Sequence, residues 1–401
     1  MVLPLQGTRV VDMSEEIAGP YSSMQLGDFG ADIIKVEPLG GDWARSLGAK
    51  VKGESALFLA LNRNKKSLAV DVENDRGKKI VQQLVREADV FLEAFRPGQA
   101  DELGVGYEDM SRINPSLVYC SISAFGSSGP YRDRAASELE IQGMALYQWH
   151  LGEPGGAPVR LGADAASVSA GQSAFAGILA ALYYRKKTGI GQKVETSLLS
   201  ALIKYGCPIY ATSYDPESWS GMLTAPYDHP ETGYKTKDRP LFFGNFDLGR
   251  RGGEAWINFC KGVGLNELLE DSFFREWGMR MVGMGRDAQE WKPVIEQAFE
   301  DKTAEELKEI IETAGGYAGI LKTYEDVFNE PQVDAVEMVQ EIEHPVAGKI
   351  RVTGIPYKLA DTPGKIRTPP PTLGQHTDEI LTGLGYSREE ITALRQAKVV
   401  A

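Results

Sequence analysis

Hydrophobic and polar positions alternate along the first half of the chain in blocks that are typical of an α/β protein. Short apolar runs with the length and composition of buried strands occur at 9–13, 31–37, 68–72, 90–93 and 117–122. Between them, segments such as 21–29 and 74–88 carry apolar residues at helical spacing. This alternation of strands and helices predicts a parallel sheet covered by helices on both faces.

One stretch, from Ala163 to Tyr184, is almost uninterrupted in small and apolar residues. Gly171, Ala174 and Gly177 recur in it at helical spacing, so one face of the predicted helix carries almost no side chain. Such a face lets another backbone or a flat ligand approach closely. The simplest interpretation is a buried helix in an α/β core. We expect this helix to end at Gly189, a residue type favoured just after a helix.

The character of the sequence changes after about residue 212. Between 213 and 335, tryptophans and mixed-charge helices replace the regular alternation, and a β-rich piece then precedes a last helix at 387–396. We therefore expect residues 1–212 to form the N-terminal part of a large α/β domain and residues 213–335 a smaller domain. Residues 336–401 are expected to return to the large domain.

Composition places the chain among ordinary globular proteins, with 42% hydrophobic and 25% charged residues. A net charge of −13 without a long basic run argues against a nucleic-acid partner. Three widely spaced cysteines fit a reducing compartment, and they form no metal-ligand pattern with the four histidines. The N-terminus does not resemble a signal peptide, and no stretch approaches the roughly 18 apolar residues of a membrane span. We expect a cytoplasmic protein with no metal, no membrane contact and, lacking G-x-G-x-x-G, no nucleotide redox cofactor.

Motifs spread over almost the whole chain resemble those of class III CoA-transferases. They are PLQGTRVVDMS, GADIIKVEP, LNRNKKSLAVDV, FRPG, SISAFGSSGPYRDR, TGIGQKVE, HPVAGKIRVTGIPYKL and TPPPTLGQHTDEIL, and they follow the family's order. The resemblance implies a Rossmann-like parallel-sheet large domain plus a smaller α+β domain, in two chains that interlock as rings. It also implies transfer of CoA from a CoA thioester to a carboxylic acid, through anhydride and thioester intermediates on one aspartate.

The resemblance further implies where CoA would bind. The family's CoA-contact positions match Ile17, Ala18, Lys65, Lys66, Phe95, Arg96 and Glu138. Residues 249–253 resemble the family's flexible glycine loop, although a plain turn explains them equally well. Tyr147, Trp149 and Phe175 could line a pocket for an aromatic acid, but aromatic residues at such places are more often core.

The family's nucleophilic aspartate is missing from the loop that enters the small-residue helix. It lies four residues before the glycine that matches Gly171, which is the position of Ser167 here. A serine would form an ester, which cannot follow the same anhydride sequence. Asp164 is the nearest carboxylate, but three extended residues displace a Cα by up to roughly 10 Å. A loop-capping role is favoured for Asp164. No histidine stands just after GPYRDR, where the racemases of the family carry one, and Ser167 removes the other base, so a racemase is set aside.

Two cations that the family commonly places near CoA are also replaced by acids. Glu73 stands where a lysine is common and Glu102 where an arginine is common, while Ala94 replaces a frequent asparagine. An acid in place of a cation repels the CoA phosphates instead of attracting them. Together with Ser167, these changes favour lost catalytic function. We therefore interpret the chain as a catalytically silent subunit of a heteromeric CoA-transferase, paired with a paralogous active chain.

Two alternatives stay open. The chain could pair with itself and act as a self-sufficient acyl-CoA transferase that uses Asp164. It could also be a non-catalytic scaffold or binding protein that has left CoA chemistry. The sequence does not identify the carboxylic acid or the CoA donor.

Overall fold

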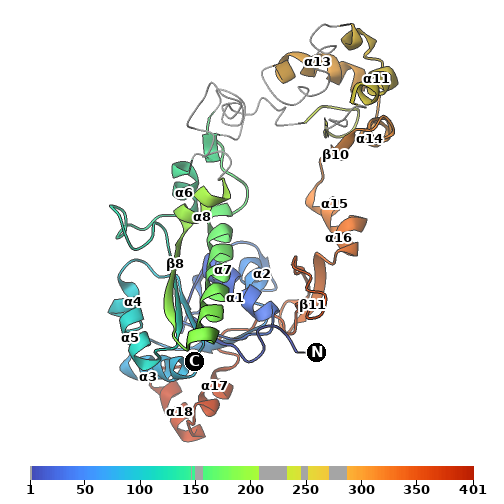
Figure 1. Ribbon diagram of the computed structural model, residues 1–401. Coiled ribbons are helices and arrows are strands. Elements are labelled where there is room, and N and C mark those ends of the chain that lie inside the picture. The colour runs from blue at the N-terminus through green and yellow to red at the C-terminus, as the bar shows by residue number, and fades with distance from the viewer. Residues whose placement is uncertain (1, 146, 150–156, 207–232, 245–251, 271–286) are drawn as a thin grey trace. The chain divides into compact units, whose positions relative to one another are not determined.

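Two compact units make up the part of the chain that the computed structural model describes, namely residues 2–145, 147–149, 157–206, 233–244, 252–270 and 287–401 (Figure 1). Unit 1 comprises residues 1–145, 162–205 and 331–401, and unit 2 comprises residues 146–161 and 206–330. The sequence placed the boundaries near 212 and 335, and it did not separate 146–161 from the large domain.

A six-stranded parallel sheet forms the centre of unit 1. Its strands are β1 (Arg9–Asp12), β2 (Asp32–Glu37), β5 (Lys65–Ala69), β6 (Val90–Glu93), β7 (Val118–Ser123) and β8 (Gln192–Ser197). Their spatial order is β5-β2-β1-β6-β7-β8, and every neighbouring pair is parallel. The predicted parallel α/β sheet is therefore confirmed. The chain runs from β1 outward to β5 and then returns to β6 beside β1, so the strand order reverses between β1 and β6. Ligands of such sheets bind outside the carboxyl ends of the strands at this reversal.

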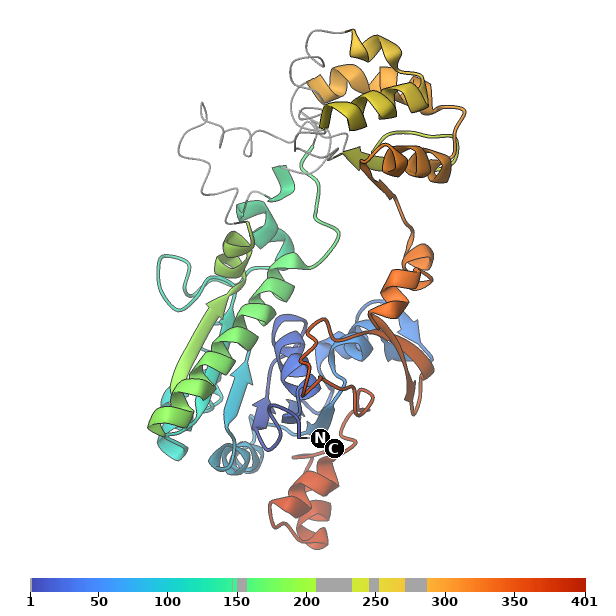
Figure 2. The same ribbon diagram turned by 45° about the vertical axis from the view of Figure 1, so that its right-hand side comes forward.

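Helices cover both faces of the sheet, as Figure 2 shows. On one face, α1 (Ala18–Asp28) and α7 (Ala165–Thr188) pack over a core that includes Val10, Val90 and Leu92. On the other face, α3 (Asp75–Arg86), α17 (Thr377–Gly383) and α18 (Arg388–Gln396) pack over a core with Val11 and Phe91. Neighbouring strand residues such as Val10 and Val11 point to opposite faces, which explains why these strands are apolar throughout.

The remaining elements of unit 1 connect or flank these layers. They are η1 (Trp43–Ser46), β3 (Lys50–Val51), β4 (Glu54–Ser55), α2 (Ala56–Leu61), α4 (Gln99–Glu102), α5 (Tyr107–Ile113), α6 (Glu138–Met144), α8 (Leu198–Tyr205), α16 (Pro331–Ala335), β11 (Val339–His344) and β12 (Gly348–Thr353). After the β11–β12 hairpin the chain returns to the sheet, where Val400 forms a β-bridge with Val70 just beyond β5.

Unit 2 has its own hydrophobic core. Its described elements are η2 (Tyr147–Trp149), β9 (Leu241–Gly244), α11 (Gly252–Val263), η3 (Asn266–Leu269), α13 (Asp287–Phe299), α14 (Ala304–Thr313), β10 (Tyr317–Ile320) and α15 (Tyr324–Phe328). Strands β9 and β10 pair in antiparallel fashion, and Trp256, Phe259 and Phe299 are buried among the helices. This cluster accounts for the aromatic, mixed-charge character of the middle of the sequence.

The small-residue face of α7 is used for close packing, as its pattern predicts. A Cβ atom added at Gly171 would lie 2.4 Å from the carbonyl oxygen of Ala18 in α1. A Cβ atom added at Gly177 would lie 2.7 Å from the side chain of Val194 in β8. Helix α7 ends at Gly189 in the left-handed conformation, with φ of 74°.

Helix α7 corrects the expectation that no stretch of the chain approaches a membrane span. Its 24 residues are long and apolar enough to cross a bilayer by length and composition. Small residues produce this result, because glycine, alanine and serine dilute the charges without adding large side chains. Residues along its length, from Ala166 to Ala181, are buried in unit 1, so α7 packs as a core helix of that unit.

Three element boundaries differ from the sequence expectations. Helix α1 begins at Ala18 rather than Tyr21, because Pro20 falls in the first turn, where its missing N–H has no helical partner to lose. Strand β5 begins at Lys65 rather than residue 68, because the amino group of Lys65 is neutralised inside the protein. Helix α3 spans Asp75–Arg86 rather than 74–88, because Asn74 is its N-cap and its side chain accepts a hydrogen bond from the backbone N–H of Arg76.

Candidate functional site

Ser167, which stands at the nucleophile position, is the third residue of α7 and not part of the preceding loop. Its side chain is almost fully buried, and its hydroxyl donates a 2.7 Å hydrogen bond to Glu138 Oε2. The backbone N–H of Ser167 donates to the same oxygen at 2.8 Å, and that of Ala166 donates to Glu138 Oε1 at 2.8 Å. The Glu138 carboxylate therefore caps the N-terminus of α7.

Glu138 is held in place from its own helix as well. It is the first residue of α6, which begins with a capping box between Ser137 and Glu140. The side-chain amide of Gln142 donates a 2.9 Å hydrogen bond to Glu138 Oε1. Four donors thus converge on one carboxylate, and each of its oxygens accepts two of them. An attack by this carboxylate on an acyl carbon would require it to give up some of these hydrogen bonds.

Asp164 occupies the N-cap position of α7, but its side chain makes no capping hydrogen bond. The carboxylate of Glu138, and not that of Asp164, therefore caps this helix. Sequence reasoning missed this contact because Glu138 lies 29 residues before Ser167. A capping box within α6 is visible in the sequence, whereas a cap supplied by another helix leaves no local signal.

Two of the predicted CoA-contact residues lie close to this helix end. Ile17 is the N-cap residue of α1, and Ala18 is its first residue. The carbonyl oxygen of Ala18 faces Gly171, which lies one helical turn beyond Ser167 on the same side of α7. The structure thus brings Ile17, Ala18, Glu138 and Ser167 together where α1 meets α7.

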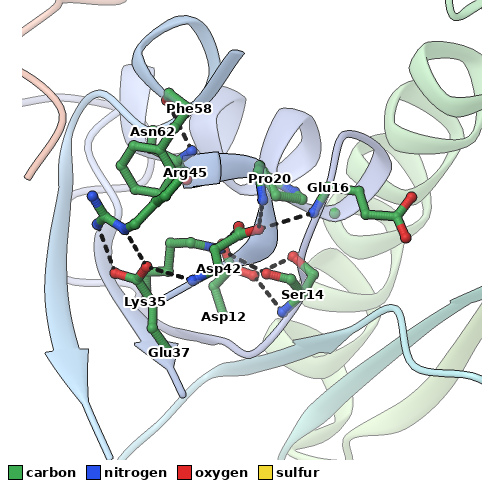
Figure 3. Close-up of polar contacts among 12 residues, drawn as sticks. Asp12, Ser14, Glu16, Pro20, Lys35, Glu37, Asp42, Arg45, Phe58 and Asn62 are labelled. Carbon is green, nitrogen blue, oxygen red and sulfur yellow. Dashed lines mark hydrogen bonds and ion pairs between the residues drawn. The ribbon is translucent and has the colours of Figure 1, made fainter. Parts of the chain in front are cut away.

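A buried polar network fixes the loop that leads into α1 (Figure 3). Asp12, at the end of β1, accepts hydrogen bonds from the backbone and hydroxyl of Ser14 and from Ser23. Lys35 donates to the carbonyl oxygen of Ser14 at 2.7 Å and forms an ion pair with Asp42 at 2.8 Å. These bonds leave the carboxyl end of β1 with a defined backbone path.

Lys65 belongs to the same network and is not available to a ligand. Its ammonium group lies 3.2 Å from Asp12 Oδ2 and donates to the carbonyl oxygen of Pro20 at 3.0 Å. Burial lowers the pKa of Lys65 to about 8, although Asp12 acts in the opposite direction. Burial would raise the pKa of Asp12, but Lys65 and Lys35 bring it below its usual value. Lys65 lies buried in β5, so it is not a residue of a solvated surface.

Lys66 and Arg96 do not converge on one site. Lys66 is half-exposed and forms a 2.6 Å ion pair with Glu379, beside a cavity at the amino ends of β1, β2 and β5. Arg96 lies beyond the carboxyl end of β6, where its guanidinium pairs with Glu102 at 2.7 Å. The two cations therefore belong to opposite edges of the sheet.

A cavity of about 540 Å³ opens at the carboxyl edge where the strand order reverses. It is lined by Met13, Glu15, Glu16, Val36, Glu37, Pro38, Leu39, Val70, Asp71, Val72, Glu73, Ala94, Phe95, Arg96, Gln99 and Leu103. Phe95 and Arg96 thus lie where the sheet topology places a ligand. The volume is within the range of small-molecule sites.

The loop beside this cavity is strained at Glu16, whose φ of 67° is uncommon for a residue with a side chain. Burial, followed by repulsion from Asp42, raises the pKa of the preceding Glu15 to about 7. A non-glycine residue held in this conformation indicates that the surrounding contacts determine the loop.

The remaining sequence candidates lie elsewhere. Phe175 is buried in the core of unit 1, where its ring stacks on those of Phe29 and Tyr357 with centroids 6.4 Å away in both cases. Tyr147 and Trp149 belong to unit 2, so the aromatic pocket is not assembled within unit 1. Most of the proposed glycine loop, residues 249–251, lies outside the described residues. Within the described ranges, no group of three or more His, Cys, Asp or Glu side chains is arranged to hold a metal ion.

Comparisons with known proteins agree with this geometry. The chain is 33% identical to the Homo sapiens succinyl-CoA:glutarate CoA-transferase over all of this chain and 90% of the relative. It is 29% identical to the beta subunit of the Chloroflexus aurantiacus succinyl-CoA–L-malate CoA-transferase, over 99% of this chain and 98% of the relative. Among solved structures, a CAIB/BAIF family protein from Brucella suis matches with a TM-score of 0.79 at 28% identity, covering 96% of this chain and all of that one. Residues 5–377 match the family described as CoA-transferase family III, and the chain belongs to that family.

Proposed function

We propose that this chain is the catalytically silent subunit of a heteromeric enzyme that moves CoA between carboxylic acids in the cytoplasm. The observation that carries the proposal is Ser167 at the nucleophile position, with its hydroxyl bound to Glu138. A serine cannot form the mixed anhydride on which this family's transfer depends, because its acyl product is an ester. The partner would be a paralogous chain that retains the aspartate.

The relatives support both parts of this proposal. The Chloroflexus aurantiacus relative is named as a beta subunit, so heteromeric assembly occurs among similar proteins. Several relatives, from Homo sapiens and Chloroflexus aurantiacus, are named for succinyl-CoA. Succinyl-CoA is therefore the first donor to test, with glutarate and an aromatic acid as the first acceptors.

The test is co-expression of the chain with its paralogue, followed by native mass spectrometry and CoA-transfer assays. We expect a one-to-one complex whose activity is abolished by replacing the partner's aspartate with alanine. Ser167→Ala should leave the turnover of that complex essentially unchanged. The opposite pattern, with activity lost in Ser167→Ala and kept in the partner's variant, would refute the silent-subunit proposal.

A second candidate is a self-sufficient homodimer, and the Glu138 carboxylate beside Ser167 is the observation that favours it over Asp164. If Glu138 is the nucleophile, CoA attacks the Glu138 carbonyl of the mixed anhydride, the substrate acid leaves, and Glu138 is left as a CoA thioester. Hydroxylamine then displaces CoA and leaves a hydroxamate on Glu138, which mass spectrometry of the peptides locates. The purified chain, incubated with succinyl-CoA and then hydroxylamine, should yield this adduct on Glu138 if the chain acts alone. If the silent-subunit proposal holds, the peptide remains unmodified.

A further inference from the structure

The cavity at the carboxyl edge of β1, β2 and β6 is lined by an excess of carboxylates. Glu15, Glu16, Glu37, Asp71 and Glu73 contribute acidic side chains to its wall, whereas Arg96 is the one lysine or arginine among its described lining residues. A concave wall of one charge concentrates its electric field inside the cavity. The wall of this cavity therefore carries more acidic than basic groups, and Asp71 and Glu73 are the carboxylates whose charge an anion inside it would meet most directly.

Most of the carboxylates that line the cavity have no basic partner among the described residues. Glu37 forms an ion pair with Arg45, but no described lysine or arginine lies within ion-pair distance of Glu15, Glu16 or Asp71. The raised pKa values of Glu15 and Glu16 have burial as their first cause and repulsion from Asp42 as the second. The surroundings of both glutamates therefore disfavour a negative charge on them, through loss of hydration first and through Asp42 second.

The single lining cation is already engaged. Arg96 pairs with Glu102 on α4 at 2.7 Å, so its charge is partly cancelled before any ligand arrives. Lys35 precedes the lining residue Val36 in β2, and Lys65 lies in the neighbouring strand β5. Both ammonium groups are fully buried and bound to carboxylates. Neither of them can reach a phosphate without breaking the network beneath the loop.

We infer that this cavity excludes the phosphates of CoA in this chain, so that the heteromeric enzyme holds one CoA for each pair of chains. The inference rests on the proposed pairing with a paralogous subunit, and it assigns Glu73 and Glu102 as the residues that set this selectivity. Glu73 lines the cavity itself, and Glu102 acts through Arg96. CoA carries several phosphate charges, and like charges held close together oppose binding.

The experiment is isothermal titration of the intact heteromer with CoA at low and moderate salt. The expected stoichiometry is one CoA per pair of chains. A stoichiometry of two would overturn the inference and would leave the silent-subunit proposal intact, because binding of CoA does not require the nucleophile.

A charge-restoring variant shows whether charge causes the exclusion. The double variant Glu73→Lys with Glu102→Arg adds a cation to the wall and also releases Arg96 from its ion pair. It should create a second CoA site, with an affinity roughly tenfold or more above that of the original cavity. The new affinity should fall as salt is raised. The control is Glu300→Lys with Glu309→Lys, which makes a similar change in net charge on unit 2 and should leave the stoichiometry at one.

The outcome for the unpaired chain separates failure of this inference from failure of the proposed function. If the chain proves to be an active homodimer, the silent-subunit proposal fails, and titration of that homodimer then tests the cavity directly. CoA binding to the unmodified homodimer would overturn the exclusion as well. No binding, with binding gained in the double variant, would support exclusion by Glu73 and Glu102 independently of the partner.

Discussion

The hydroxyl of Ser167 and the carboxylate of Glu138 are separated by 2.7 Å, and the hydroxyl donates to an oxygen that also accepts the Ser167 backbone N–H. One acid from α6 therefore satisfies the N-terminus of α7 and the residue at the family's nucleophile position. A structural role of this kind makes specific predictions about stability that do not depend on catalysis.

Glu138→Ala should destabilise unit 1 by about 1–3 kcal/mol, because it leaves two N–H groups of α7 without their acceptor. Ser167→Ala should cost less, about 1 kcal/mol, since it removes one hydrogen bond and the backbone caps remain. Urea unfolding measures both free energies, and the exposed Glu309→Ala provides the baseline. Equal effects of Glu138→Ala and Glu309→Ala would show that the cap contributes nothing.

Ser167→Asp should make stability depend on pH. The new carboxylate would lie beside Glu138, and repulsion between the two would raise the pKa of this carboxylate pair in the folded state. A folded-state pKa above the unfolded value means that stability is lost as pH rises through that range. The unfolding temperature of Ser167→Asp should therefore fall, relative to the unmodified chain, between pH 5 and pH 8. The double variant Ser167→Asp with Glu138→Gln removes the repulsion and should show a flat difference.

Gly171→Ala and Gly177→Ala should change the free energy of unfolding by different amounts, although both residues lie in α7. At Gly171 the new methyl group meets the backbone oxygen of Ala18, which cannot move without shifting α1, and the expected loss is about 1–3 kcal/mol. At Gly177 it meets the side chain of Val194, which can adjust. Alanine also improves helix propensity by roughly 1 kcal/mol, so Gly177→Ala should be near neutral. Chemical denaturation of the two variants in parallel decides the matter, and a neutral Gly171→Ala would contradict the close contact.

Glu15→Gln should stabilise the chain above neutral pH and have little effect at pH 5. Burial, then Asp42, raises the pKa of Glu15 to about 7 from its usual 4.5, so the folded state binds more protons than the unfolded state between these values. Stability contributed by this protonated carboxyl is present at low pH and is lost as pH rises toward 7. The melting-temperature difference between Glu15→Gln and the unmodified chain should therefore grow between pH 5 and pH 8. The same comparison with Glu309→Gln should give no trend.

The parallel sheet could be predicted because its strands are apolar on both faces, as Val10 and Val11 illustrate. The close packing of the small-residue face of α7 could also be predicted, because Gly171 and Gly177 occur at helical spacing. The sequence does not indicate which residues they contact. The last helix was predicted over 387–396 and is α18, which Ser387 caps by a local rule.

The candidate site was less predictable because its contacts join distant segments. Lys65 looks like a surface residue in the sequence, and only the fold reveals that Asp12, 53 positions earlier, neutralises it. Glu138 was expected to contact CoA by resemblance, but its bonds to α7 depend on where α6 begins relative to α7. The excess of acidic side chains in the carboxyl-edge cavity likewise depends on the fold. Glu15 lies in the loop after β1, whereas Asp71 and Glu73 lie in the loop after β5, and only the structure shows that they line one wall.

The β-bridge between Val400 and Val70 has a consequence for the timing of folding. The apolar face formed early by Leu68 and Val81 is completed by Leu394 and Val399, which are synthesised after unit 2. Because domains fold as their parts are synthesised, unit 1 stays unfinished until all of unit 2 has been made. Throughout the synthesis of unit 2, the first part of unit 1 therefore lacks the cover that Leu394 and Val399 later provide. Apolar surface exposed during synthesis is prone to aggregation, so this is the vulnerable interval in the folding of the chain.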